Sequence, residues 1–331
     1  MSEAHRKGVA LITGASGFIG SRLRDALLAD GHDVVVLTRP DSPAPKAGRG
    51  APVDYADTES LTRVLRAERP EVIYHLAGAT KGVSYDDFQR GNVMPTQNLL
   101  HAARDAHPDL QRFVHVSSLT AFGPSTPERP TEEHHERKPV EHYGRSKLEA
   151  EQLVEAAAKD VPVTIIRPPA VYGPGDVDNF ELFRLAARGL NVFYGNRERL
   201  FSAVYVDDLV RGIRDAAAHS ATVGKGYFLC DGVPRTWGQY QQHIVEASGR
   251  RALQLSFPEL VVDVAAFFGV LATAIDKKPR LFNKQKALLG KQLAWTCRSE
   301  RARQDFGYAP AVEVRDGIER TFAWYRDHAW I

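Results

Sequence analysis

Several features are scarce in this chain of 331 residues, and each scarcity excludes a class of protein. Its only cysteines, Cys230 and Cys297, are far apart in sequence, so they form neither a disulfide framework nor a zinc cluster. This usage is typical of a reducing compartment, and we expect a cytoplasmic protein. The formal net charge is only +2, and no basic run or basic-aromatic stripe indicates a nucleic-acid partner. The adjacent acids and histidines of Glu132–Glu136 rarely converge on one ion, so no metal is expected.

Long hydrophobic runs are also missing. The segment Met1–Lys7 is short and polar, without the apolar core of a signal peptide. The most apolar stretch, Leu260–Ile275, is too short to span a bilayer and contains Asp263. It predicts an amphipathic core helix, and the alternative is an interfacial helix that makes peripheral contact with a membrane.

Strand and helix patterns alternate through the first half of the chain. This alternation, with short connections, predicts an α/β fold of the Rossmann type, built on a doubly wound parallel sheet. The Pro- and Gly-rich segment Arg39–Pro52 predicts a loop. The strand patterns are Val9–Thr13, Asp33–Leu37, Val72–Leu76, Phe113–Val116 and Val163–Ile166, and the helical patterns are Ser21–Ala29, Ser60–Ala67, Met94–Ala106 and Tyr143–Lys159.

The first strand pattern runs directly into Gly14-x-x-Gly17-x-x-Gly20, and an amphipathic run follows. A strand that turns on glycines into a helix aims the unpaired N–H groups and the positive dipole end of that helix at one point. Gly14 permits the tight turn, Gly17 lets the backbone approach a phosphate, and Gly20 lets the helix contact the strand. Because both the strand and the helix are present, the glycines predict a dinucleotide pyrophosphate site.

From Gly173 onward the alternation weakens, and isolated strand patterns appear at Ser202–Val206 and Gly226–Leu229. This change predicts a smaller, interleaved C-terminal α/β domain that binds the substrate. We assign residues 1–172 plus about 200–222 to the NAD(P)-binding Rossmann domain. The substrate-binding domain then comprises about 173–199 and 223–331.

Tyr143 and Lys147 stand four residues apart at the start of an amphipathic run, so on a helix they share one face. A free phenol has a pKa of about 10. Before desolvation, an ammonium about 4 Å away contributes about 4 kcal/mol at an effective dielectric near 20, or about three pK units. The pair therefore predicts a Tyr143 able to act as general acid and base. The alternative is a core tyrosine with a solvated lysine, since this spacing is common by chance.

A strand pattern that ends in hydroxyl groups favours the catalytic interpretation. Phe113–Val116 is followed by Ser117, Ser118 and Thr120, and ligands of open α/β sheets bind beyond the carboxyl ends of strands. There Ser118 can hydrogen-bond a substrate oxygen whose proton Tyr143 moves. A serine that merely closes a strand-end turn is the alternative.

Together these motifs resemble the extended short-chain dehydrogenases/reductases, the NAD-dependent epimerase/dehydratase family. The resemblance extends from Val9 to about Tyr325, and within the family it is nearest to members like 3β-hydroxysteroid dehydrogenase and dihydroflavonol reductase. The further motifs that carry it are Asp54, His75-Leu-Ala77-Gly78, Asn92, Arg167-Pro-Pro-Ala-Val-Tyr-Gly-Pro-Gly175 and Val206-Asp207-Asp208.

The resemblance implies a role for particular residues. Ser118, Tyr143 and Lys147 would be the catalytic triad, and members often dimerise through the helices that begin here near Met94 and Tyr143, so a homodimer is implied. Thr80, Thr120 and Phe201 are expected to contact a small-molecule substrate. The implied cofactor-binding residues are Gly14, Ser16, Gly17, Phe18, Ile19, Gly20, Asp54, Tyr55, Leu76, Ala77, Gly78, Ser117, Tyr143, Lys147, Pro168, Ala170 and Val171.

Three departures from the family pattern narrow the interpretation. Many NAD-using members end the second strand in an acid, whereas this chain has Thr38 followed by Arg39. Because Arg39 can pair with a 2′-phosphate, NADP is the preferred cofactor and NAD the alternative. Leu119 and Thr120 replace the acidic pair of sugar-nucleotide dehydratases. Phe201 replaces the arginine with which epimerases hold a diphosphate, which favours an apolar substrate unless Arg197 or Arg199 substitutes.

We therefore hypothesise an NAD(P)(H)-dependent oxidoreductase that interconverts a secondary alcohol and a ketone on a largely apolar small molecule. The first alternative is a nucleotide-sugar 4-epimerase of the same family. The second is a dinucleotide-binding protein without turnover, since a fold does not determine a function.

Overall fold

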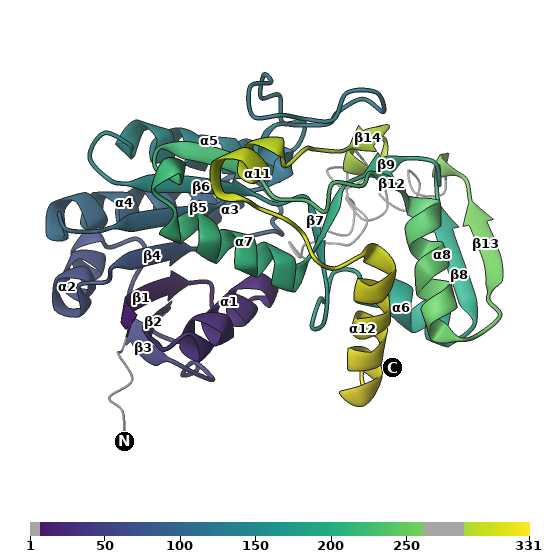
Figure 1. The fold of residues 1–331 in the computed structure, drawn as a ribbon, viewed down its shortest axis with the longest axis horizontal. Helices are drawn as coiled ribbons and strands as arrows, with labels where there is room; N and C mark the ends of the chain where they lie inside the picture. Colours follow the sequence, from purple (N-terminus) through teal and green to yellow (C-terminus); the bar gives the residue numbers. More distant parts are fainter. Residues whose placement is uncertain (1–6, 261–287) are drawn as a thin grey trace.

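The computed structural model describes residues 7–260 and 288–331. Its main feature is a seven-stranded sheet with the order β11-β6-β5-β4-β1-β2-β3, in which every neighbouring pair is parallel. The order runs outward in both directions from β1, so the predicted doubly wound sheet is confirmed (Figure 1). Its strands are β1 (Lys7–Thr13), β2 (His32–Thr38), β3 (Arg49–Pro52), β4 (Val72–His75), β5 (Arg112–Val116), β6 (Val163–Arg167) and β11 (Lys225–Phe228).

Helices bury their apolar stripes against both faces of this sheet. On one face α1 (Phe18–Ala29) and α7 (Val206–Ala218) pack on β1, β2 and β5 through a core that includes Leu23, Leu27 and Ile213. On the other face the core joins Leu61 and Leu99 to β1 and β4. The helices on that second face are α2 (Thr58–Glu68), α4 (Met94–Ala106) and α5 (His142–Ala157).

The structure corrects two expectations about the sheet. Residues 49–52, expected in a loop, form β3, which pairs with β2 at one edge. The strand pattern Gly226–Leu229, expected in the smaller domain, is β11, which pairs with β6 at the opposite edge of the main sheet. Both are short edge strands that form by pairing with another segment of the chain, and such pairing cannot be predicted from local composition.

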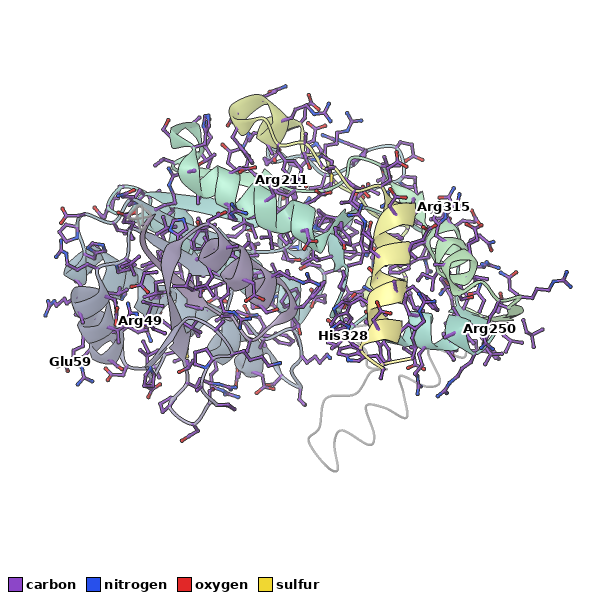
Figure 2. All side chains as sticks on the ribbon, turned by 60° about the horizontal axis from the view of Figure 1, so that its bottom comes forward. Arg49, Glu59, Arg211, Arg250, Arg315 and His328 are labelled. Carbon is purple, nitrogen blue, oxygen red and sulfur yellow. The ribbon has the colours of Figure 1, made fainter. Side chains whose placement is uncertain are left out.

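A second unit adjoins the carboxyl end of the sheet (Figure 1). Its aromatic-rich core contains Phe183, Tyr240, Phe322 and Tyr325. The helix α12 (Val314–Asp327), whose ends carry Arg315 and His328 in Figure 2, lies against α8. The other elements of this unit are α6 (Phe180–Ala187), α8 (Trp237–Ser248), β8 (Leu190–Tyr194), β9 (Leu200–Phe201), β12 (Arg235–Thr236), β13 (Leu253–Phe257) and β14 (Ala294–Trp295).

Short elements connect the two units. The strands β7 (Ala170–Tyr172) and β10 (Ala203–Tyr205) pair in parallel beside the main sheet. The remaining elements are α3 (Tyr85–Phe88), the π-helix η1 (Gln89–Val93), the 3₁₀ helices η2 (Leu119–Ala121) and η3 (Ser220–Thr222), and α11 (Glu300–Phe306).

The apolar stretch Leu260–Ile275 lies, apart from its first residue, outside the described residues. Within 7–260 and 288–331, no helix combines the length and the apolar composition that crossing a bilayer requires.

Candidate active site

The glycine turn joins β1 to α1 as the sequence predicts. Gly14 has φ +71°, a conformation that favours glycine, and the Gly17 N–H donates to the Gly14 carbonyl at 3.0 Å. Gly17 is the N-cap of α1 and supplies no side chain to the first turn, which also contains no acid. The N–H groups of that turn are therefore available to an anion.

Two positions next to this turn have room only for glycine. A Cβ atom on Gly20 would stand 2.1 Å from the Gly14 carbonyl oxygen, and one on Gly14 would stand 2.7 Å from the Ala77 nitrogen. Ser16 and Gly17 are exposed and line an open cleft of about 830 Å³ together with Arg22 and Lys46. This backbone cradle fits a dinucleotide pyrophosphate, and Gly14, Ser16, Gly17, Phe18, Ile19 and Gly20 are the residues that would hold it.

The end of β2 contacts the turn that carries Tyr55. The Tyr55 hydroxyl donates to the Leu37 carbonyl at 3.3 Å, and the Asn98 amide donates to the Tyr55 carbonyl at 2.8 Å. The exposed Arg39 guanidinium lies close enough to Tyr55 to favour its phenolate, although burial raises the phenol pKa. Asp54 accepts from the Ala56 N–H at 2.9 Å, so it orders the turn that carries Tyr55. Arg39 therefore brings a positive charge to the side of this turn.

A buried polar chain links the glycine turn to α5. The two ring nitrogens of His75 bond the hydroxyls of Thr13 at 2.8 Å and Thr96 at 2.9 Å. Thr96 donates to the Asn92 carbonyl at 2.7 Å, and the Asn92 amide donates to Ser146 of α5 at 2.8 Å. The Thr13 hydroxyl also accepts from the backbone of Leu76 and Ala77. The position of β4, and with it Leu76–Gly78, therefore depends on contacts made by α4 and α5.

The start of α5 is held by an acidic cap and a close helix approach. The Glu141 carboxylate accepts from the N–H groups of Tyr143 and Gly144. A Cβ atom on Gly144 would stand 2.4 Å from the Thr120 carbonyl oxygen, so only glycine lets α5 come this near η2. That approach brings the Tyr143 phenol near Ser118, which acts to lower the phenol pKa.

Ser118 is the centre of a small cluster of hydroxyls. Its Oγ accepts from the Thr120 N–H at 3.2 Å and from the Thr120 hydroxyl at 3.0 Å, and Ser118 also acts to lower the pKa of the Tyr143 phenol. The neighbouring Ser117 Oγ is buried and has no hydrogen-bond partner among the described residues. A buried hydroxyl without a partner is uncommon, and this one fits a polar group of the cofactor expected beside it.

Lys147 lies one turn below Tyr143, but it does not acidify the phenol as expected. Its Nζ donates to the Val116 carbonyl at 2.8 Å, and burial lowers its pKa to about 8 while the Glu151 carboxylate opposes that change. Burial raises the pKa of Tyr143 to about 12, Ser118 opposes this rise, and Glu141 adds to it. The expected depression of the phenol pKa is not found here, because that expectation was stated before desolvation, and burial is the largest influence on this phenol.

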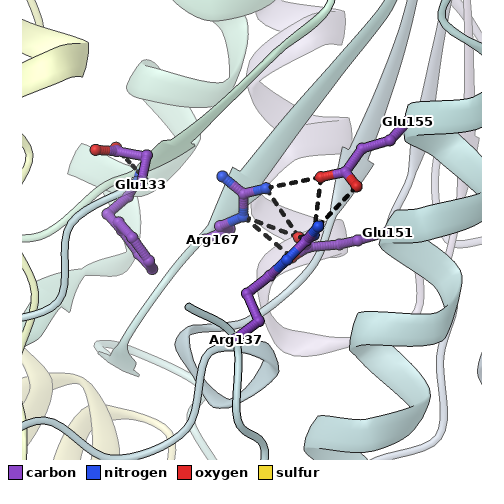
Figure 3. Close-up of polar contacts among 6 residues, drawn as sticks. Glu133, Arg137, Glu151, Glu155 and Arg167 are labelled. Carbon is purple, nitrogen blue, oxygen red and sulfur yellow. Dashed lines mark hydrogen bonds and ion pairs between the residues drawn. The ribbon is translucent and has the colours of Figure 1, made fainter. Parts of the chain in front are cut away.

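Further along α5, Glu151 anchors the helix to the sheet and to a loop (Figure 3). Its carboxylate is fully buried and accepts from Arg167 of β6 at 2.8 Å and from Arg137 of the preceding loop at 3.2 Å. Arg137 also pairs with Glu155 at 2.8 Å. Since Arg167 directly precedes Pro168, this network sets α5 against Pro168, Ala170 and Val171, the segment expected beside the nicotinamide.

The expected substrate residues divide into two groups. Thr120 belongs to the hydroxyl cluster, and Thr80 is exposed on the loop after β4. That loop is joined to the loop after β7 by Lys81 and Asp178, whose charged atoms are 3.3 Å apart, and the Asp178 carboxylate acts on the Tyr143 phenol.

Phe201, in contrast, is a core residue. It is 3% exposed and stacks on Trp237 with ring centroids 4.1 Å apart. Packing accounts for this phenyl ring, so the inference from Phe201 to an apolar substrate is not supported. Arg197 and Arg199 were the two candidates to replace the diphosphate-binding arginine of epimerases. Arg199 pairs with Glu259, and the guanidinium of Arg197 lies 5.8 Å from the centre of the Phe193 ring.

Sequence reasoning missed the residues that position the site rather than form it. Glu141 as the cap of α5, Gly144 as the close contact and Ser146 as the link to Asn92 were given no role. The usual N-cap pattern did not indicate this cap, because it contains Ser, Thr, Asp or Asn and not glutamate. No local pattern indicated Asp178, which reaches the site from a loop beyond β7.

Comparison with known proteins agrees with this geometry. Residues 10–229 match the profile of the NAD dependent epimerase/dehydratase family. The chain is 30% identical to a ceramide reductase from Caulobacter vibrioides, over 98% of this chain and 96% of the relative. It is also 30% identical to a UDP-glucose 4-epimerase from Mycolicibacterium smegmatis, over 96% of this chain and 98% of the relative.

The solved structures show the same fold. A UDP-glucose 4-epimerase from Thermotoga maritima, determined with UDP-glucose, superposes with a TM-score of 0.80 at 23% identity and covers 97% of this chain and 99% of its own. The family profile spans most of the chain, and the two relatives match almost the whole length of the chain. The chain therefore belongs to the NAD-dependent epimerase/dehydratase family, the extended short-chain dehydrogenases/reductases, and is an enzyme of that family.

Proposed function

We propose that this enzyme uses NADP(H) to interconvert a ketone and a secondary alcohol on a largely apolar small molecule. The observation that carries the proposal is the hydroxyl cluster of Ser118 and Tyr143 at the end of β5, with Lys147 buried one turn below. The nicotinamide would supply or accept the hydride. In the direction of reduction, Ser118 orients the substrate oxygen and Tyr143 donates the proton to it.

Reduction needs a protonated phenol at Tyr143, as any tyrosine supplies below its pKa. With a pKa raised to about 12, the Tyr143 phenol holds its proton at neutral pH and can act as a general acid. Lys147, buried one turn along α5, would hold the nicotinamide ribose. Thr120 in place of an acidic residue leaves no group for the elimination that a dehydratase requires.

The end of β2 supports NADP over NAD. Thr38 brings no negative charge that would repel a 2′-phosphate, and the exposed Arg39 guanidinium lies beside the adenine turn at Tyr55. Arg39→Ala is expected to weaken NADPH binding by about tenfold or more while NADH binding changes little, since a charge-assisted bond contributes about 1.5–3 kcal/mol.

The apolar substrate class rests on similarity, because Phe201 no longer supports it. The ceramide reductase relative matches almost the whole chain. The test is reduction of a panel of aryl, steroid and long-chain ketones by the purified enzyme with NADPH, monitored by cofactor absorbance. Tyr143→Phe should abolish turnover but leave the NADPH-induced thermal shift in place. Turnover of UDP- or GDP-sugars with no ketone reduced would overturn the proposal.

A nucleotide-sugar 4-epimerase is the second candidate. Arg235, which pairs in register with Phe201, is 6% exposed and keeps its Nη1 without a partner among the described residues, so a cation is present near the place that an epimerase arginine occupies. The UDP-glucose 4-epimerase relative is as similar to the chain as the ceramide reductase is. Retained cofactor and conversion of UDP-sugars without net absorbance change would favour this candidate.

A further inference from the structure

The loop between β4 and α3 is held at both ends by side chains. At its start, the Asn92 Oδ1 accepts from the Ala79 N–H at 2.6 Å, and the Asn92 amide donates to the Ala79 carbonyl at 3.1 Å. Toward its end, the Asp87 carboxylate accepts from the Val83 N–H at 2.9 Å. Lys81, between these two anchors, is therefore carried by a loop with a defined place on the molecule.

This loop lies beside the catalytic phenol. A Cβ atom on Gly82 would stand 3.0 Å from the Phe88 ring, so the loop packs directly on that ring. The Phe88 ring lies next to the Tyr143 ring, with centroids 6.2 Å apart. At the start of the loop, a Cβ atom on Gly78 would stand 4.0 Å from the Lys147 Nζ. The loop therefore forms one edge of the candidate active site.

The loop after β7 has anchors of its own. The buried Asp176 carboxylate accepts from the Asp178 N–H at 2.8 Å and from the Asn179 amide at 2.7 Å. The Tyr325 hydroxyl of α12 donates to the Asp176 carbonyl. This loop is therefore fixed by the second unit, whereas the loop after β4 is fixed by η1 and α3.

Lys81 and Asp178 join the two loops. Their charged atoms are 3.3 Å apart, and their side chains are 57% and 62% exposed. Burial is the main reason that the pKa of Tyr143 is raised to about 12, and the Asp178 charge adds to the rise, so the ion pair is within electrostatic reach of the phenol. Val83, on the first loop, and Val177, next to Asp178, are exposed apolar side chains at the same edge of the site.

This contact is weak enough to open readily. An ion pair between exposed side chains favours the closed arrangement by about fivefold at most. Because each loop keeps its own anchors, parting of the pair separates the loops without unfolding either of them. Burial of an exposed valine against an apolar molecule contributes more than an exposed ion pair does, so such a molecule can displace the pair.

We propose that the Lys81–Asp178 ion pair is a clasp across the entrance to the active site, and that it parts when a broad apolar substrate enters. With the clasp closed, the opening between the two loops admits narrow molecules only. With the clasp open, Val83 and Val177 contact the apolar body of the substrate. The clasp therefore sets how strongly the enzyme discriminates between narrow and broad substrates.

The clasp belongs to the proposed active site, and the choice of ketones as substrates rests on the proposed function. Access to a bound nicotinamide needs no turnover, however, so the clasp can be tested even if no ketone is reduced.

The first experiment measures quenching of the fluorescence of bound NADPH by two neutral molecules, the narrow acrylamide and a broad piperidine nitroxide. At low salt, Lys81→Ala and Asp178→Ala should each raise the nitroxide quenching constant about two- to fivefold and change the acrylamide constant little. In the wild type, NaCl at about 1 M should raise the nitroxide constant toward that of the variants, because salt screens an exposed ion pair. The two variants should respond little to salt.

A charge exchange separates the ion pair from its individual side chains. Lys81→Asp with Asp178→Lys places opposite charges at the same two positions, and it should return the nitroxide quenching constant to the wild-type value.

Lys225→Ala is the matched control. Lys225 pairs with Asp305 at 2.8 Å and is the first residue of β11. Because the strands of the main sheet are parallel, this pair lies at their amino end, whereas the clasp follows the carboxyl end of β4. The control should leave quenching by both molecules unchanged.

The second experiment compares kcat/KM for a narrow methyl ketone and a broad steroid ketone. Lys81→Ala should raise kcat/KM for the steroid ketone about two- to fivefold and leave the value for the methyl ketone unchanged.

An unchanged nitroxide quenching constant in Lys81→Ala would overturn the proposal. An equal rise in Lys225→Ala, or a charge exchange that does not restore the wild-type value, would overturn it as well. Inactivity toward every ketone, with the expected pattern of quenching, would contradict the proposed function alone.

Discussion

Acid should destabilise this enzyme through two buried histidines behind the active site. His75 and His115 are each 1% exposed, and their ring centroids are 5.5 Å apart. Burial and the charge of Lys147 lower the pKa of His75 to about 3, and the same causes place the pKa of His115 well below its usual value. Both rings are therefore neutral in the folded enzyme at neutral pH.

The sign of the effect follows from which state binds protons. In the unfolded chain a histidine has a pKa near 6.5. On acidification the unfolded state therefore binds protons that the folded state does not bind. The stability contributed by His75 is complete above that value and is lost as the pH falls toward about 3. Between about pH 8 and pH 5 this loss amounts to about 2 kcal/mol for His75, and His115 adds to it in the same direction.

The assay is urea unfolding at about pH 8 and about pH 5, at a fixed protein concentration. Both ring nitrogens of His115 are buried without a partner among the described residues, so His115→Leu removes one proton-binding group without breaking a hydrogen bond. Its loss of stability between the two pH values should be clearly smaller than that of the wild type. His101→Gln, at an exposed position of α4, should behave as the wild type does.

An equal loss of stability in His115→Leu and the wild type would refute this reasoning. It would mean that the acid sensitivity comes from other groups, such as the paired carboxylates.

Three further predictions concern the glycine turn, the ion network and the cofactor. Gly20→Ala should abolish the NADPH-induced thermal shift, because its Cβ would stand 2.1 Å from the Gly14 carbonyl oxygen. Arg167→Met should reduce the free energy of unfolding by about 3–5 kcal/mol, because it removes one partner of the fully buried Glu151 carboxylate. Urea unfolding measures this free energy, and a change below about 1 kcal/mol would contradict the argument. Arg39→Asp should reverse the preference between NADPH and NADH in a fluorescence titration, and an unchanged preference would place the 2′-phosphate elsewhere.

Local patterns were enough to predict most of the dinucleotide-binding half. The helix predicted at Met94–Ala106 has the observed bounds of α4, and the strand patterns from Val9 to Ile166 correspond to β1, β2, β4, β5 and β6. Hydrophobic periodicity and glycine position act over a few residues, so the sequence displays them directly. The family motifs likewise indicated the order of Ser118, Tyr143 and Lys147 along the chain.

The tertiary structure decided what depends on burial and on distant partners. It placed β11 in the main sheet, buried Phe201 against Trp237, and joined Arg167 to Glu151 across α5 and β6. It also reversed the expected shift of the Tyr143 pKa, because desolvation depends on every element packed around a side chain. The sequence by itself determined which groups the site contains, and only the folded chain determined their charge and their neighbours.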